Sequence, residues 1–303
     1  MKKYFNIILL VGVVFSLPRY SLQEATSCMS CHVNPTGSGM RNDYGSNIFS
    51  LEELPLERYA SEGDENWDGY INDNIQIGGD FRIQAFKDGE DENIFPMQAD
   101  VYANIDINKK ANLYLKVDLS RHLSDEYFVL FKDVFKNTWM KIGQSLPNYG
   151  LKIDDHTSFI RGGNVNSIFS GNYTQYDEGL FFDINNEPPI IFEIGTKLNS
   201  TYLSFSMGNN YISNNFLDGI INFSSSINSY YQLDDLSILT GLSFMKESDV
   251  KSYSFFGGFS IEKYSFLFEI DKAENWIQDL DSYAAMLQMT YKPIQGLHLL
   301  AKY

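Results

Sequence analysis

From Ile75 to the last residue, apolar and polar side chains alternate with a period of two. Within 75–85, Asp80, Arg82 and Gln84 fall on one parity, whereas isoleucine, phenylalanine and alanine fall on the other. Such alternation is typical of strands whose two faces meet different surroundings. The same pattern recurs in 97–107, 111–119, 236–244, 253–261, 264–270, 283–291 and 297–303. The sequence therefore predicts an all-β structure over residues 75–303.

Two architectures produce this alternation, a soluble β-sandwich and a transmembrane β-barrel. Sandwich strands are usually about 5 to 6 residues long. Many segments here run to about 9 to 11 residues, the length that a tilted strand needs to cross a membrane. Aromatic residues also lie near strand ends, where the girdles of membrane barrels lie: Tyr127, Trp139, Tyr202, Tyr253, Tyr264 and Tyr283. We therefore predict a transmembrane antiparallel β-barrel of about 14 to 16 strands.

The predicted connections alternate in length, as in outer-membrane barrels, whose short turns face the periplasm. Short connections are expected at 108–110, 136–137, 199–200, 234–235, 262–263 and 292–296, and longer ones at 87–96, 144–151, 208–215, 246–250 and 272–281. Strict alternation requires one further strand within 150–173, which gives about 15 strands. Because bacterial barrels normally have an even number of strands, we expect either one misassigned strand or a chain that stops one strand short of closure.

The beginning of the sequence has the layout of a secretory signal peptide. Lys2 and Lys3 precede an apolar run, Phe5–Leu17, which is shorter than the roughly 20 residues of a transmembrane helix. We assign residues 1–21 to the signal peptide. The full sequence is strongly acidic, with 23 Lys and Arg against 39 Asp and Glu. This balance argues against nucleic acid as a partner, because phosphate neutralisation needs basic clusters.

The sequence CMSCH at residues 28–32 matches the attachment motif of a c-type haem. Thiols at i and i+3 can each bond one vinyl group of the porphyrin, and the histidine that follows binds the iron. A zinc site would need a second cysteine pair, and the chain has only 2 cysteines. A thioredoxin-like dithiol needs a strand before it and a helix after it, and a lipobox would leave His32 without a role. We predict one covalent haem c, with Cys28 and Cys31 as thioether anchors and His32 as the axial iron ligand.

The second axial ligand is open at this stage. Met40 is the first candidate, because a Met/His pair raises the haem potential and eight residues can reach about 26 Å when extended. The alternative is that Met40 only packs against the porphyrin. His156 and His122 are the next candidates, although each is also expected as a polar barrel or loop residue. An open iron position is the remaining alternative.

The predicted haem-binding segment, residues 22–59, is too small for an ordinary core, since chains below about 40 residues need a cofactor or partner to fold. A barrel of about 14 to 16 strands has a lumen wide enough to be a water-filled channel unless it is plugged. We therefore expect this segment in the lumen or at the periplasmic mouth of the barrel.

Residues 60–74 are interpreted as an acidic linker, because they are rich in Asp, Glu, Asn and Gly. Asp64, Asn66 and Asp68 match the start of a calcium loop. The twelfth position is Ile75, however, where a bidentate carboxylate is usual. A solvated turn is therefore the default interpretation, and calcium at Asp64 to Asp68 is the alternative.

Taken together, the signal peptide, the segment CMSCHVNPTGSGMRNDYG at 28–45 and the barrel-like remainder resemble the fused monohaem cytochrome-porin proteins of bacterial outer membranes, including the iron-oxidising type. The resemblance implies a location in the Gram-negative outer membrane, in contact with its lipid. It also implies electron passage between a periplasmic carrier or cytochrome and an extracellular donor or acceptor such as iron.

The alternative function is a porin or scaffold barrel, for small solutes or for a partner multihaem cytochrome, with its own haem as a periplasmic relay. No hydrolase, nucleotide-binding or metalloprotease motif stands out in the sequence. We therefore expect an electron-transfer protein rather than a conventional enzyme.

Overall fold

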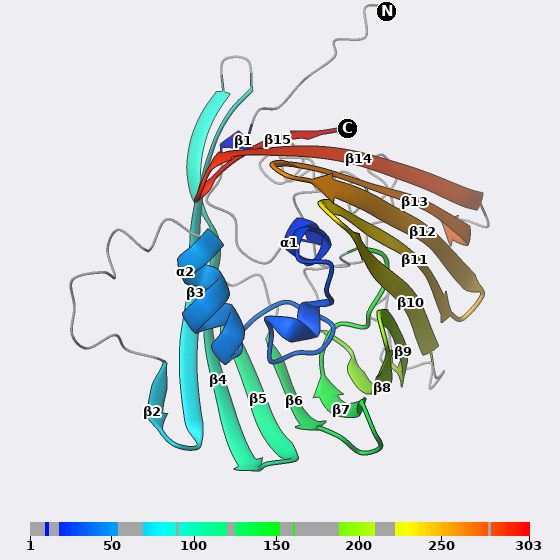
Figure 1. The fold of residues 1–303 in the computed structure, drawn as a ribbon. Coiled ribbons are helices and arrows are strands. Elements are labelled where there is room, and N and C mark those ends of the chain that lie inside the picture. Colours follow the sequence, from blue (N-terminus) through cyan, green and yellow to red (C-terminus); the bar gives the residue numbers. More distant parts are fainter. Residues whose placement is uncertain are drawn as a thin grey trace, which may run out of the picture.

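A computed structural model describes residues 10–11, 18–53, 69–88, 91–119, 125–151, 160, 188–209, 222–277 and 280–303. Within these residues a single sheet of 15 strands runs in the order β1-β15-β14 and onward, strand by strand, to β3-β2. Pairing is antiparallel throughout. Figure 1 shows the sheet curving around the N-terminal segment. The prediction of an all-β antiparallel barrel is confirmed.

The strands are β1 (Leu10–Val11), β2 (Tyr70–Asn72), β3 (Ile75–Asp88), β4 (Asp91–Asn108), β5 (Ala111–Asp118), β6 (Glu126–Phe131), β7 (Thr138–Gln144), β8 (Ile190–Leu198), β9 (Thr201–Gly208), β10 (Asn222–Leu233), β11 (Leu236–Glu247), β12 (Val250–Ile261), β13 (Tyr264–Ile277), β14 (Leu280–Ile294) and β15 (Leu297–Lys302). The N-terminal segment holds α1 (Pro18–Gln23), the short helical turns η1 (Cys28–Ser30) and η2 (Gly45–Phe49), and α2 (Ser50–Glu53). None of the helices in the described ranges is long and apolar enough to cross a membrane.

Five of the six predicted short turns are confirmed. The sixth, expected at 136–137, spans 132–137, because β6 ends at Phe131 and β7 begins at Thr138. Together these turns mark one end of the sheet, here called the short-turn end. At the opposite end, here called the long-connection end, three predicted loops were too long. Strands continue through most of 87–96, 246–250 and 272–281, because polar residues also pair in ladders, as Lys87 does with Glu92. β7 pairs directly with β8, so the sheet has no further strand between them. Of the stretch 150–173, only 150, 151 and 160 are described.

The sheet keeps two edges in the described residues. At one edge, β15 pairs beyond β14 only with the two residues of β1. At the other edge, β3 carries only the short strand β2. No described pairing joins β15 to β2 or β3, so hydrogen bonding does not close the sheet.

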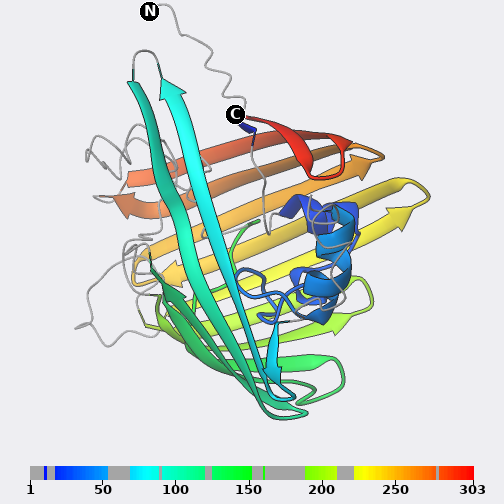
Figure 2. The ribbon, with the colours of Figure 1, turned by 90° about the vertical axis from the view of Figure 1, so that its left-hand side faces the viewer.

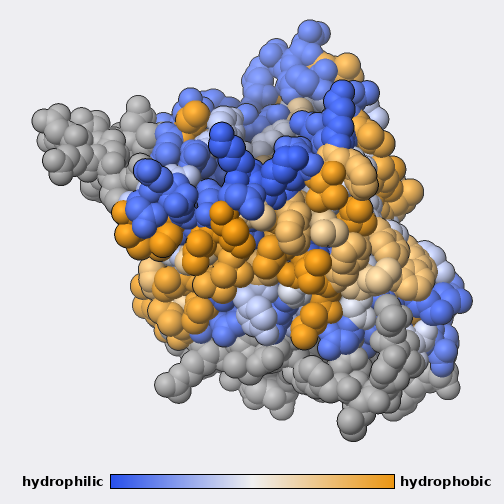
Figure 3. All heavy atoms as spheres, turned by 90° about the horizontal axis from the view of Figure 1, so that it is seen from below, coloured by the Kyte–Doolittle hydropathy of each residue, from blue (hydrophilic) through white to orange (hydrophobic). Residues whose placement is uncertain are grey.

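Polar side chains face the interior and apolar side chains face outward. On β12, Tyr253, Phe255 and Phe259 are exposed, whereas the alternating Ser252 and Ser254 are buried. Figure 3 shows an apolar band across one face, bordered by polar residues. This inverted pattern is that of barrels whose outer surface is covered by lipid. The sheet is therefore a transmembrane barrel wall with a polar lumen.

Not every aromatic residue predicted for the girdles faces outward. Tyr127, Tyr264 and Tyr283 are exposed, but Trp139 is buried in the interior. It shares its interior-facing parity on β7 with the fully buried Lys141, and it lies over its cross-strand partner Gly195. Position along the strand suggested a girdle, whereas parity decides the face.

The N-terminal segment lies inside the curved sheet, toward the short-turn end (Figure 2). Leu22 of α1 packs with Tyr230 and Phe256 of the wall. At the other end of the segment, Lys292 Nζ lies 2.7 Å from the Glu53 carboxylate. This position agrees with the expectation that the segment occupies the lumen or the mouth at that end.

Two predicted boundaries concern this segment. Helix α1 includes Pro18–Ser21, which belong to the stretch assigned to the signal peptide, and the 1–21 boundary stays a prediction. Of the predicted linker 60–74, only 69–74 are described, and Tyr70–Asn72 form β2. The candidate calcium positions Asp64 to Asp68 lie outside the described residues.

Candidate functional site

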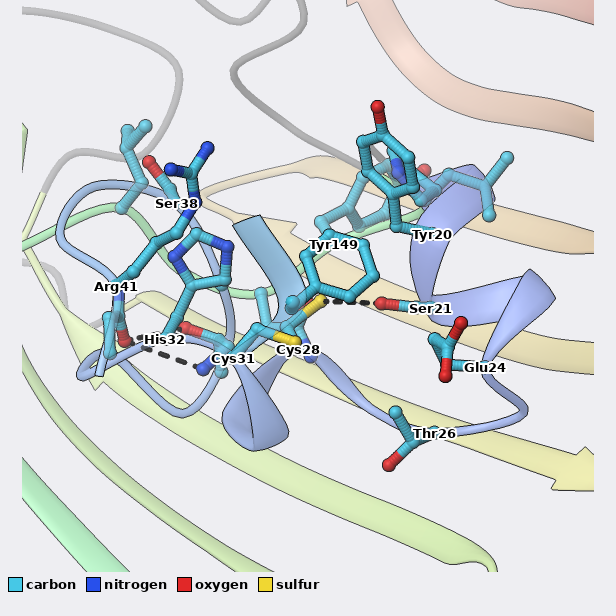
Figure 4. Close-up of a pocket in the computed structure, with 18 of the residues that line it drawn as sticks. Tyr20, Ser21, Glu24, Thr26, Cys28, Cys31, His32, Ser38, Arg41 and Tyr149 are labelled. Atoms are coloured by element: carbon cyan, nitrogen blue, oxygen red, sulfur yellow. Dashed lines mark hydrogen bonds between the residues drawn. The ribbon is translucent and has the colours of Figure 1, made fainter. Parts of the chain in front are cut away.

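The predicted haem-binding side chains line one cavity inside the barrel. The backbone turns tightly at η1, where the amides of Cys31 and His32 both donate to Cys28 O, at 3.1 and 3.0 Å. This turn brings Cys28, Cys31 and His32 to the wall of a cavity of about 880 Å³, its open mouth included. Figure 4 shows both sulfur atoms and the His32 imidazole facing the same space.

Asn42 holds the motif in this conformation. Its amide Nδ2 donates to Ser30 O at 3.1 Å and to Met29 O at 3.3 Å, and its backbone N donates to Cys31 O at 2.9 Å. Its Oδ1 accepts from Gly45 N at 3.0 Å. The motif is thus fixed by contacts within the N-terminal segment itself.

Gly37 leaves room for the first thiol. It has φ +95°, a conformation that L side chains rarely adopt, and a Cβ added there would lie 2.9 Å from Cys28 Cβ and 3.0 Å from its Sγ. Both cysteines are free of disulfides. Two cysteine thiols and an imidazole on one cavity, with space kept open beside a sulfur, are the donor set and the cradle that fit a haem c.

The ionisation of the Cys31 thiol separates this site from a reactive dithiol. Burial is the main cause that raises the pKa of Cys31 to about 11, and the neighbouring Cys28 contributes in the same direction. Redox-active cysteines of the thioredoxin type have lowered pKa values, because the thiolate is their reactive form. The environment of Cys31 therefore does not match that alternative.

The far wall of the cavity is a loop that folds into the lumen from the long-connection end, Ser145–Leu151, here called the inward loop. It contributes Leu146, Pro147, Asn148, Tyr149 and Leu151 to the cavity lining. Wall side chains anchor its backbone: Gly150 N donates to Ser243 Oγ at 3.0 Å, and Leu151 N donates to Glu269 Oε2 at 3.1 Å. The cavity therefore lies between the N-terminal segment and the inward loop.

A buried lysine ties these parts together. Lys141 Nζ lies 2.8 Å from Glu193 Oε1, with both side chains fully buried. The same nitrogen donates to Asn34 Oδ1 at 3.2 Å in the N-terminal segment and to Ser145 Oγ at 3.2 Å in the inward loop. The Lys141 ammonium group thus links the barrel wall, the N-terminal segment and the inward loop.

Met40, the first candidate for a distal ligand, points away from the cavity. Its side chain is buried among Tyr102, Tyr114 and Phe128, in what is here called the wall cluster, with its methyl group near Gly78. Its backbone N donates to Tyr114 Oη at 3.1 Å. This geometry matches packing against the wall rather than ligation, and Met40 as a ligand stays a prediction that the geometry does not support.

The other histidines do not fill that role in the described residues. His298 is buried on β15, with Nε2 3.2 Å from Tyr20 Oη, and is not part of the cavity lining. His122 and His156 lie outside the described residues. The residue that faces the motif across the cavity is instead Tyr149 of the inward loop (Figure 4). Sequence reasoning missed it, because 144–151 was expected to be an external connection.

Comparison with known proteins gives distant structural likenesses. No protein-family model matches the chain. No curated protein matches its sequence. Among solved structures, a porin aligns with 72% of this chain and 79% of its own, at TM-score 0.44 and 10% identity. OmpT, an outer-membrane protein of Vibrio cholerae, aligns with 76% of this chain and 86% of its own, at TM-score 0.37 and 12% identity. Such distant likeness carries no functional argument, and the proposals rest on this chain's own geometry.

Proposed function

We propose that this chain is a β-barrel protein of the Gram-negative outer membrane that carries one covalent haem c in its lumen and passes electrons across the membrane. The observation that carries the proposal is the convergence of Cys28, Cys31 and His32 on one cavity inside a lipid-facing barrel. Bound there, the haem would supply one-electron redox chemistry. Cys28 and Cys31 would anchor the haem, and His32 would hold the iron. Asn42 would keep these three residues in position through its hydrogen bonds to the motif backbone.

The position of the cavity supports a conduit rather than a surface carrier. The hydrocarbon layer is about 30 Å thick, so a redox centre on one surface would leave most of it uncrossed. Here the N-terminal segment enters from the short-turn end and the inward loop enters from the other end, and they meet at the cavity. A periplasmic electron carrier or cytochrome would exchange electrons at the short-turn end. An extracellular donor or acceptor, such as iron, would do so at the other end.

A second candidate function is a porin for small solutes. One observation favours it: many of the buried polar residues that face the lumen are serines, which are small and leave space for water. They include Ser224, Ser226, Ser243, Ser252, Ser254, Ser260 and Ser265. In this reading the haem serves only as a periplasmic relay.

One experiment separates the two functions. The purified protein is inserted into liposomes that enclose a redox dye. A reductant that cannot cross membranes on its own is then added outside. For the conduit, the enclosed dye is reduced with the parent protein but not with Cys28→Ala/Cys31→Ala, whose barrel is checked by its circular dichroism. Equal reduction in both proteins, or none in either, would rule out the conduit. Liposome swelling in sugar solutions, measured in parallel, tests the porin function.

A further inference from the structure

A buried apolar cluster lies between the haem cavity and the long-connection end of the barrel. It consists of Tyr149, Ile191, Met245, Ala273 and Trp276, and is here called the rim cluster. Ile191 is the second residue of β8, Met245 lies near the end of β11, and Trp276 lies next to the end of β13. All three positions are at the long-connection end. Tyr149 belongs both to this cluster and to the cavity lining, so it joins the two.

Trp276 reaches the interior only because β13 contains a bulge. Glu269, Asp271 and Ala273 alternate as buried residues on β13, so unbroken alternation would place Asn275 inside next. The pairing with β14 instead shifts register between Ala273 and Ile277, and Asn275 takes φ 55° and is exposed. Trp276 is consequently only 6% exposed. Bulges often lie beside functional sites, where they re-aim a side chain.

Tyr149 is held as firmly as Trp276. It is 1% exposed, and the backbone on either side of it is fixed to the wall. Asn148 O accepts from Ser224 Oγ at 2.7 Å, and Gly150, at φ 62°, donates to Ser243 Oγ at 3.0 Å. Burying loop backbone requires such partners, because an unpaired buried amide or carbonyl costs free energy. Polar wall residues thus hold the Tyr149 ring at the point where the cavity meets the rim cluster.

We propose that Tyr149 and Trp276 form the electron path between the haem cavity and the long-connection end, which this proposal assigns to the outside of the cell. It rests on the proposed conduit function. Electron tunnelling weakens steeply with distance and with empty space between groups, so two aromatic rings in one buried cluster couple the two ends better than water or a void would. With haem bound, a one-electron acceptor at the rim, such as a ferric chelate, would take up one electron from the ferrous haem iron, which would leave a ferrous chelate and a ferric haem. No bond forms or breaks, and neither ring is itself oxidised.

The main test measures electron exchange from each side separately. Tyr149→Leu and Trp276→Leu remove a ring, Tyr149→Phe keeps it, and Phe128→Leu removes a ring from the wall cluster as the matched control. Each protein is inserted into vesicles, with its orientation established by protease access to the long connections. Reduced haem is then oxidised with a membrane-impermeant ferric chelate placed either at the long-connection side or at the short-turn side.

We expect the long-connection rate to fall severalfold in both leucine variants and to stay at the parent value in Tyr149→Phe and Phe128→Leu. The short-turn rate and the haem absorption spectrum stay unchanged in Trp276→Leu and Phe128→Leu, whose altered side chains do not line the cavity. Unchanged long-connection rates in the leucine variants, or equal losses from both sides, would overturn the path. If Tyr149→Leu does not take up haem, Trp276→Leu, which does not line the cavity, decides the question. A haem-loaded parent that is not oxidised from the long-connection side at all refutes the conduit itself, which is a distinct result.

A second measurement tests the contact without haem. In Cys28→Ala/Cys31→Ala with Trp67→Phe and Trp139→Phe, Trp276 is the one tryptophan left of 3. Tyr149→Leu should shift its fluorescence to the red by opening the rim cluster to water, whereas Phe128→Leu should leave it in place. Emission that Tyr149→Leu does not shift would contradict the packing on which the path depends.

Discussion

Replacing Lys141 should destabilise the barrel strongly, because its partner Glu193 is fully buried and would keep an uncompensated charge. Removing one member of a buried ion pair typically costs about 3–5 kcal/mol. Lys141 also donates to Asn34 and Ser145, so Lys141→Met should loosen the N-terminal segment and the inward loop as well. We expect a loss of about 3–5 kcal/mol in the free energy of unfolding.

The assay is guanidinium unfolding in lipid vesicles, followed by tryptophan fluorescence, for the parent, Lys141→Met and Lys141→Met/Glu193→Met. Because an apolar pair leaves no bare carboxylate, the double variant should recover part of the loss. Lys292→Met is the control, since its ion pair with Glu53 is partly exposed and should contribute no more than about 1 kcal/mol. The reasoning is wrong if Lys141→Met costs no more than Lys292→Met, or if the double variant is no more stable than Lys141→Met.

Three further predictions concern the motif. Gly37→Ala should reduce the fraction of chains that carry haem, measured by intact mass, because the added Cβ would press on Cys28. The neighbouring control, Ser38→Gly, should not reduce that fraction. Equal haem loading in the two variants would contradict the steric argument. Asn42→Ala should lower the thermal stability of the haem-loaded protein by removing hydrogen bonds that contribute about 0.5–1.5 kcal/mol each. Asn42→Asp, which keeps an acceptor, should lose less stability. An unchanged melting temperature in Asn42→Ala would contradict this role of Asn42. In the haem-free protein, alkylation of Cys31 should be slow at neutral pH and become faster toward pH 11, because a pKa of about 11 leaves little thiolate at lower pH. An alkylation rate that levels off by about pH 8, near the ordinary thiol pKa, would refute this prediction.

The sequence predicts the wall of this barrel well, because period-two alternation is a local property that each strand carries by itself. Five of the six short turns follow from the same alternation, since polar pairs such as Asp234 and Asp235 interrupt it. The haem motif is equally local, and its three side chains do share a cavity. These features needed no knowledge of distant contacts.

The interior beyond the motif could not be predicted in this way. The inward loop is held by Ser224, Ser243 and Glu269, which lie far away in sequence. Trp276 lies on the outward parity of β13 and is turned inward only by a bulge. Met40 is close enough to reach the iron by chain length, but a hydrogen bond to Tyr114 and packing in the wall cluster set its direction. In each case a tertiary contact decides what the local pattern leaves open.

The enclosure of Cys28 and Cys31 also bears on the order in which the protein is made. Forming two thioether bonds requires an attachment enzyme to reach both thiols and the edge of the porphyrin. In the folded barrel these thiols line a cavity inside the lumen, between the N-terminal segment and the inward loop. On the proposed function, haem attachment therefore comes before folding: the chain receives its cofactor near its N-terminus while still unfolded in the periplasm, and the strands that follow assemble around it.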